Sequence, residues 1–249
     1  MVTELRPFTL DDRLTVWAPY EAEARWQYDE IFSHRCYDGV QIEPDGIVLD
    51  VGANIGLFTL FLKRKFPDAR VRAFEPMPQL ARALRRNIEE QQLGAVSVHQ
   101  RALGTQQERA VFEYYPLAPG NSTRYPADKE LQIAVLSHEG PEEFIRSHYR
   151  AEPVSVQVDR LSDYLAPDEH VGLVKIDVEG AELDVLRGID HHHWELIDQF
   201  LLEVQDLDGR LAAVTTLLEA YDFTVAVEPS PLIPPEIRTF LVAAVRHTP

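Results

Sequence analysis

Residues 48–61 read VLDVGANIGLFTLF, and this stretch decides the fold. Residues 47–51 form a short apolar run rich in β-branched side chains, which is typical of a buried strand, and residues 55–65 carry apolar side chains at helical spacing. Between them, Gly52 and Gly56 permit a tight turn in which a ligand approaches the backbone closely. The stretch therefore predicts a strand, a ligand-binding turn and a helix.

The alternation of strands and helices continues along the chain. Further strands are expected at residues 70–75, 96–99, 171–177, 200–204, 223–227 and 240–245, and further helices at residues 79–91, 181–187 and 209–220. Alternation of this kind is best explained by a parallel sheet with helices on both faces. We therefore expect an α/β fold with a doubly wound, mostly parallel sheet.

Two regions lie outside this alternation. Residues 1–45 are rich in aromatic side chains and are expected to form an N-terminal cap on the main domain, residues 46–249. Residues 113–152 form a long insertion after the third strand, with helical stretches broken by Gly140 and Pro141. Because such a connection lies at the carboxyl edge of the sheet, where ligands of open α/β folds bind, a lid over an acceptor site and a plain surface excursion are equally good interpretations.

Composition excludes several classes of protein. Of the 249 residues, 45% are hydrophobic and 26% are charged, which is typical of a globular chain. The net charge of −17 repels a phosphate backbone, so nucleic acid is not an expected partner. The chain shows neither a signal-peptide pattern nor a long apolar run, so we expect a cytoplasmic protein with no membrane partner. The single cysteine, Cys36, excludes an internal disulfide and is expected to be an inert buried thiol.

The turn at residues 52–56 favours a cofactor that carries no phosphate at this point. The dinucleotide fingerprint GxGxxG needs glycines where this chain has Asn54 and Leu57, which leaves an NAD-dependent dehydrogenase as the weaker alternative. An acid, Asp50, followed by two glycines suits instead a cofactor that carries an amino acid there. Glu75, 25 residues after Asp50, is placed at the tip of the second strand to accept hydrogen bonds from a ribose.

Five motifs together resemble those of one enzyme family. They are VLDVGANIGLFTLF (48–61), AFEPMP (73–78), GNST (120–123), VKIDVEGAELDVLRGI (174–189) and LLEVQDLDGRL (201–211). The chain resembles the FkbM-type family of S-adenosylmethionine-dependent methyltransferases over roughly residues 20–246, and most of all the variant associated with polyketide and nonribosomal peptide biosynthesis. The resemblance implies a seven-stranded Rossmann-like sheet with an antiparallel last strand, and O-methylation of a hydroxyl of a secondary-metabolite intermediate, free or bound to a carrier protein.

The resemblance also implies which residues bind the cofactor. S-adenosylmethionine would lie with its methionine portion near Asp50, Gly52, Asn54 and Gly56, its ribose at Glu75, its adenine near Arg101 and Ala102, and its methyl group facing Asp177. The acceptor pocket would include Gln205 together with Asn121 and Ser122 of the GNST motif, for which a turn-forming role is the alternative.

The chain departs from the family pattern at the position of the expected catalytic base. Family members commonly carry a histidine where this chain has Gln205, and glutamine takes no proton at neutral pH. The base must then be Asp177, Glu203 or one of the insertion histidines, His138 and His148. If none serves, the chain is a non-catalytic module that only binds S-adenosylmethionine.

Two further groups could support the chemistry at residue 177. Lys175 lies two residues before Asp177, so on a strand the two side chains share a face, and Lys175 joins the expected catalytic set. Asp177 and Glu203 could also hold a divalent ion that lowers the pKa of the acceptor hydroxyl, although we expect no metal. We expect none at the tract His191–His193 either.

An acidic chain needs a local basic patch to receive an acidic carrier protein. The candidates are Lys63, Arg64 and Lys65 on one helix and Arg82, Arg85 and Arg86 on the next. A solvated helix face is the alternative for both, and the residues do not predict an oligomeric state.

Overall fold

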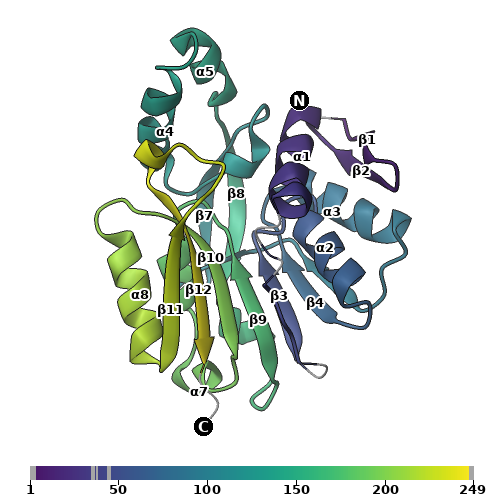
Figure 1. Ribbon diagram of the computed structural model, residues 1–249, viewed down its shortest axis with the longest axis vertical. Coiled ribbons are helices and arrows are strands. Elements are labelled where there is room, and N and C mark those ends of the chain that lie inside the picture. Colours follow the sequence, from purple (N-terminus) through teal and green to yellow (C-terminus); the bar gives the residue numbers. More distant parts are fainter. Residues whose placement is uncertain (1–3, 35–36, 38, 44–45, 247–249) are drawn as a thin grey trace.

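The main sheet of the protein has seven strands. The computed structural model describes residues 4–34, 37, 39–43 and 46–246. The strands lie in the order β11-β12-β10-β9-β3-β4-β5. Their bounds are β3 (Ile47–Val51), β4 (Arg70–Phe74), β5 (Val96–His99), β9 (Val171–Ile176), β10 (Gln199–Gln205), β11 (Phe223–Pro229) and β12 (Thr239–Arg246). Only β12 runs against the direction shared by the other six strands of this sheet (Figure 1), which confirms the expected Rossmann-like arrangement.

Helices cover both faces of this sheet, as double winding requires. They are α2 (Leu57–Lys65), α3 (Pro78–Glu90), α6 (Glu182–Arg187), α7 (His191–Trp194) and α8 (Arg210–Ala220). Alternate side chains of β3 enter two different cores: Val48 packs in the core that contains α2 and α3, whereas Leu49 and Val51 pack in the core that contains α6 and α8. Burial on both faces explains why β3 is apolar at every position except Asp50.

The N-terminal region adds a hairpin that the sequence analysis did not anticipate. Strands β1 (Arg6–Asp11) and β2 (Leu14–Ala18) pair antiparallel, and β2 is followed by α1 (Glu21–Tyr28) and a π-helical turn, Asp29–Ser33. Leu14 and Val16 are buried in the core beneath α2 and α3, and the Trp17 backbone N–H donates to Asn87 Oδ1 at 2.6 Å. These contacts fasten the N-terminal region to the main domain. Cys36 lies outside the described residues.

A second, three-stranded sheet was also missed. Its strands β6 (Ala102–Leu103), β7 (Glu108–Tyr114) and β8 (Glu152–Asp159) lie in the order β6-β8-β7. The expected insertion of residues 113–152 therefore begins at the end of β7 and ends at the start of β8. It contains α4 (Lys129–Leu136) and α5 (Glu142–His148), on either side of Gly140 and Pro141 as expected.

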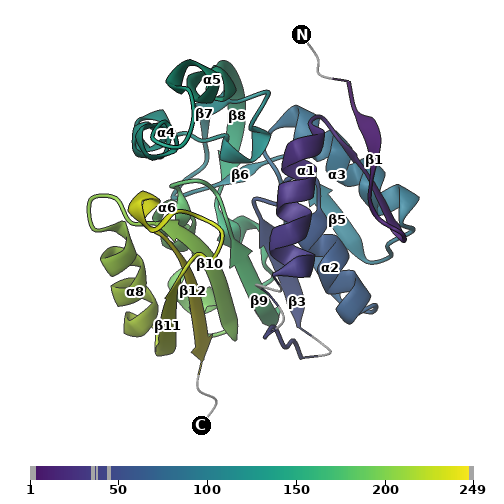
Figure 2. The same cartoon turned by 45° about the horizontal axis from the view of Figure 1, so that its top comes forward.

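The N-terminal helix and the insertion meet at the same end of the main sheet. Helix α1 and helices α4 and α5 all lie beyond the upper ends of the strands in Figure 1, and Figure 2 turns this end of the molecule forward. The parallel strands finish at this edge, where open α/β folds bind ligands. Among the described residues, no helix combines the length and apolar character needed to cross a membrane.

Candidate active site

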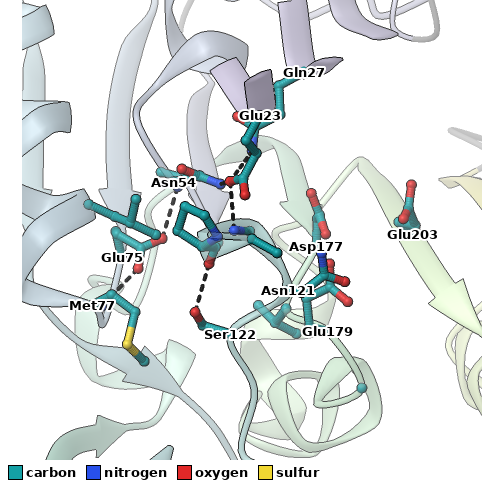
Figure 3. Close-up of a pocket in the computed structure, with 18 of the residues that line it drawn as sticks. Glu23, Gln27, Asn54, Glu75, Met77, Asn121, Ser122, Asp177, Glu179 and Glu203 are labelled. Carbon is teal, nitrogen blue, oxygen red and sulfur yellow. Dashed lines mark hydrogen bonds between the residues drawn. The ribbon is translucent and has the colours of Figure 1, made fainter. Parts of the chain in front are cut away.

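A cavity of about 450 Å³ opens at the carboxyl edge of β3, β4, β9 and β10 (Figure 3). Its walls come from α1, from the glycine turn after β3, from the insertion and from the loop at residues 232–237. Most of the residues predicted from the sequence line it: Gly52, Asn54, Glu75, Arg101, Ala102, Asn121, Ser122, Lys175, Asp177, Glu203 and Gln205. Asp50 and Gly56 are not among the lining residues.

The glycine turn brings the ends of β3 and β9 into direct contact. Gly52 has a φ of +79°, and a Cβ added there would lie 1.8 Å from the Asp177 carbonyl oxygen. Gly56 has a φ of +93° and packs against Leu84 of α3. Only glycine fits position 52, because both the backbone angle and the space exclude a side chain.

Asp50 and Lys175 form a buried pair behind this turn. Lys175 Nζ donates to the Gly52 carbonyl oxygen at 2.9 Å and lies 3.6 Å from Asp50 Oδ1 and 3.3 Å from Asp177 Oδ2. Thr59 Oγ1 donates to Asp50 Oδ2 at 2.6 Å. Asp50 is fully buried, and burial raises its pKa. The pair therefore supports the turn from behind, and Lys175 connects it to Asp177.

Glu75 presents a buried carboxylate at the tip of β4. Its Oε2 accepts from the Asn54 backbone N–H at 2.9 Å and its Oε1 accepts from the Met77 backbone N–H at 2.8 Å. Burial raises the pKa of Glu75 to about 7. Since each carboxylate oxygen has two lone pairs, both oxygens can still accept a further hydrogen bond from a ligand in the cavity.

Acidic side chains gather at the other end of the cavity. Burial and the neighbouring Asp177 raise the pKa of Glu203 well above its ordinary value. Burial and Asp177 likewise raise the pKa of Glu30, from the π-helical turn after α1, to about 8. Lys129 pairs with Glu179 beside them. In both Glu30 and Glu203, burial and the repulsion from Asp177 stabilise the protonated form relative to the ionised form.

Only some of the candidate histidines lie at the cavity, and the candidate metal ligands lie away from it. His148 lines the cavity, whereas His138 is exposed and does not. Of the described residues, Asp190, His192 and His193 alone form a group with metal-ligand spacing, and none of them lines the cavity. His193 Nδ1 lies 2.8 Å from Ser162 Oγ, so this histidine has a structural partner. Asp177 and Glu203 belong to no such group.

The insertion supplies a further part of the cavity wall. Ser122 Oγ donates to the Pro119 carbonyl oxygen at 2.7 Å, and Lys129 Nζ donates to Asn121 Oδ1 at 3.1 Å. Both residues of the GNST motif that were predicted for the acceptor pocket thus line the cavity and also hold the turn of the insertion. Gln205, on β10, donates through Nε2 to the Ile237 carbonyl oxygen at 3.2 Å. Apolar side chains from α1, the insertion and the loop at residues 232–237 also line the cavity: Trp26, Leu117, Leu136, Leu232, Ile233 and Pro234.

Comparison with known proteins identifies the family. The model of the methyltransferase FkbM domain matches residues 50–232. The chain belongs to the FkbM methyltransferase family. It is 40% identical over 243 residues to Methyltransferase 1 of Beauveria bassiana, which covers 96% of this chain and 97% of that protein. It is 38% identical over 231 residues to the 31-O-demethyl-FK506 methyltransferase FkbM of Streptomyces tacrolimicus, covering 84% and 85%.

A solved structure supports the fold of this FkbM-family methyltransferase. The crystal structure of methyltransferase FkbM from Methylobacillus flagellatus matches with a TM-score of 0.54 and 16% identity, over 84% of this chain. The match spans 45% of that longer chain. At this identity the likeness concerns the fold alone.

Two carboxylates of this FkbM-family methyltransferase were missed by the sequence analysis. Glu23 and Glu30 both line the cavity, whereas the sequence-based prediction assigned no site role to an acid of the N-terminal region. Their spacing of seven residues, two turns of a helix, was the available signal, because it places both on one face.

Some side chains of the two predicted basic patches make contacts within the fold. Lys63 donates to the carbonyl oxygens of Pro67 and Ala69, and it is buried. The Arg86 guanidinium stacks over the Trp17 ring at 3.1 Å from the ring centre. Arg82 of the same helix is exposed. Arg64 and Lys65 of α2 are also exposed, so both patches present charge to a partner.

Proposed function

We propose that this FkbM-family methyltransferase transfers a methyl group from S-adenosylmethionine to a hydroxyl oxygen of a secondary-metabolite intermediate. The observation that carries the proposal is the Glu75 carboxylate, buried at the edge of the cavity beside the glycine turn, with lone pairs available for two ribose hydroxyls. The name of the Streptomyces relative, which specifies an oxygen of its substrate, supports transfer to oxygen.

The residues of the cavity suit this cofactor. When bound, S-adenosylmethionine supplies a methyl group already activated on a sulfonium. The protein needs mainly to position the acceptor, because alignment of reacting atoms accounts for much of the rate in such reactions. The apolar part of the lining, which includes Trp26 and Leu117, suits an organic acceptor, and the acids at residues 177 and 203 line the same cavity.

The acidic pair supplies the base in this proposal. The acceptor hydroxyl loses its proton as its oxygen gains the methyl group, and Asp177 and Glu203 share the cavity wall where that proton is released. A raised pKa makes an ionised Glu203 a stronger base than an ordinary carboxylate. His148 is the remaining histidine of the insertion that faces the cavity.

Calorimetric titration tests the cofactor. S-adenosylmethionine and S-adenosylhomocysteine should both bind, with and without a chelator or added magnesium. Binding of neither refutes the proposal, and protection against heat by NAD in place of S-adenosylmethionine would favour the dehydrogenase alternative.

Turnover distinguishes an enzyme from a module that only binds the cofactor. Asp177→Asn and Glu203→Gln should each retain cofactor binding and lower kcat, by about 100-fold if either residue is the base. His148→Ala should change kcat little. A large loss confined to His148→Ala would move the base to the insertion.

The acceptor is proposed to be either free or bound to a carrier protein. Arg82 offers the cleaner test of docking, because Arg86 also supports the N-terminal hairpin through Trp17. Arg82→Glu should raise KM for a carrier-bound acceptor and leave KM for the corresponding free acceptor unchanged. Equal values for both forms would exclude docking at this face.

A further inference from the structure

One carboxylate joins three parts of the cavity that are far apart in the sequence. Glu23 Oε1, on α1, accepts from the Gly120 backbone N–H at 2.6 Å, and from Asn54 Nδ2 and Gln27 Nε2 at 3.3 Å each. Figure 3 shows Glu23 directed towards Asn54 between the glycine turn and the insertion. The N-terminal helix, the cofactor turn and the insertion therefore meet at this side chain.

Two acceptor atoms at this point have no donor. Glu23 Oε2 and Asn54 Oδ1 are both buried, and neither has a hydrogen-bond partner among the described residues. Buried acceptors without donors are costly and uncommon in folded proteins. Because both residues line the cavity, a ligand with several donors could satisfy them together.

The acidic side chains around Glu23 favour a positively charged hydrogen-bond donor over a neutral one. The charged groups that act most on Glu23 are Glu179 and Glu75, both acidic, and burial raises the pKa of Glu23 to about 8. A carboxylate without a cation in such surroundings is stabilised by a positively charged donor. An ammonium group fits both requirements, since it carries a positive charge and three N–H donors.

The position of Glu23 relative to the proposed ribose site indicates which ammonium group would bind there. The Asn54 backbone N–H donates to Glu75, the residue assigned to the ribose, while the Asn54 side chain contacts Glu23. One residue thus touches both acids, so a single ligand can reach both. We propose that Glu23 and Asn54 bind the α-ammonium group of the methionine portion of the cofactor, an inference that rests on the proposed function.

The contact with Gly120 gives this site a second consequence. A Cβ at position 120 would lie 2.9 Å from Glu23 Oε1 and 3.1 Å from Asn54 Nδ2, so the insertion approaches this closely only through a glycine. The carboxylate that binds the cofactor therefore also holds the insertion against α1. The cofactor completes a junction between the two walls of the acceptor pocket.

The proposed contact is tested by combining one substitution in the protein, Glu23→Gln, with one change in the ligand, removal of its amino group. Dissociation constants are measured by calorimetry for S-adenosylhomocysteine and for its deaminated analogue, in which hydrogen replaces the amino group. Wild-type protein should bind the analogue about 10- to 100-fold more weakly, the range expected for a charge-assisted hydrogen bond. In Glu23→Gln this ratio should fall towards one, because the amide has lost the charge.

Controls separate this contact from damage to the fold. Glu21→Gln, on the exposed side of α1 where Glu21 pairs with Arg25, should keep the wild-type ratio. If Glu23→Gln does not fold, Gly120→Ala displaces the same carboxylate and should also lower the ratio. An unchanged ratio, or equal losses for both ligands, refutes the contact while S-adenosylhomocysteine binding stands. Absence of S-adenosylhomocysteine binding to the wild type refutes the proposed function, and this inference with it.

Discussion

Glu182 should make the protein less stable as the pH rises. The side chain begins α6 and is 1% exposed. Its Oε1 accepts from the Gly180 backbone N–H at 2.8 Å, and its Oε2 is buried without a partner. Burial raises the pKa from the ordinary value of 4.5 to about 7. A carboxyl group with a raised pKa in the folded state contributes stability below its unfolded pKa, and this contribution is lost as the pH rises through the folded pKa.

The magnitude follows from the two pKa values. Between about pH 5.5 and about pH 8.5, the unfolded state releases a proton that the folded state retains longer, which lowers the free energy of unfolding by about 2 kcal/mol. Glu182→Gln removes this titration. The substitution leaves an amide in the same site at both pH values, so the cost of burying the amide cancels when the two conditions are compared.

Urea denaturation of the wild type and of Glu182→Gln at both pH values measures the effect. Relative to the wild type, the variant should gain about 2 kcal/mol on going from the lower to the higher pH. Glu219→Gln, at an exposed position of α8, is the matched control and should gain nothing. A gain near zero for Glu182→Gln, or a relative loss, would refute the argument that burial without a partner controls this carboxyl group.

Three other predictions concern the cavity. Glu75→Ala should abolish S-adenosylmethionine binding measured by calorimetry, because it removes the carboxylate proposed for the ribose, and a retained affinity would place the ribose elsewhere. Gly52→Ala would put a Cβ 1.8 Å from the Asp177 carbonyl oxygen and should leave little folded protein by circular dichroism, so a melting temperature like that of the wild type would contradict the geometry of this turn. A chelator should leave the rate of methyl transfer unchanged, and a loss restored by magnesium would show that Asp177 and Glu203 hold a divalent ion.

Local patterns predicted the main sheet and the position of the site. Strands β3 and β9 are buried on both faces, so their apolar runs were unmistakable, and the helix spacing of α2 and α3 followed from burial of one face. The smaller sheet was missed although Val154, Val156 and Val158 alternate with polar residues in β8. The N-terminal hairpin was missed because its strands are short and were grouped with an aromatic region.

The sequence by itself determined the order of the elements, the glycine turn and the acid at the tip of β4, because each depends on residues close together in the chain. Only the tertiary structure decided what those residues face. Asp50 turned out to support the turn from behind, with Lys175 and Thr59, and does not line the cavity. Glu23 reached Gly120 across 97 positions of sequence. Burial, pKa and unsatisfied hydrogen bonds arise from such long-range packing, and no local pattern of residues encodes them.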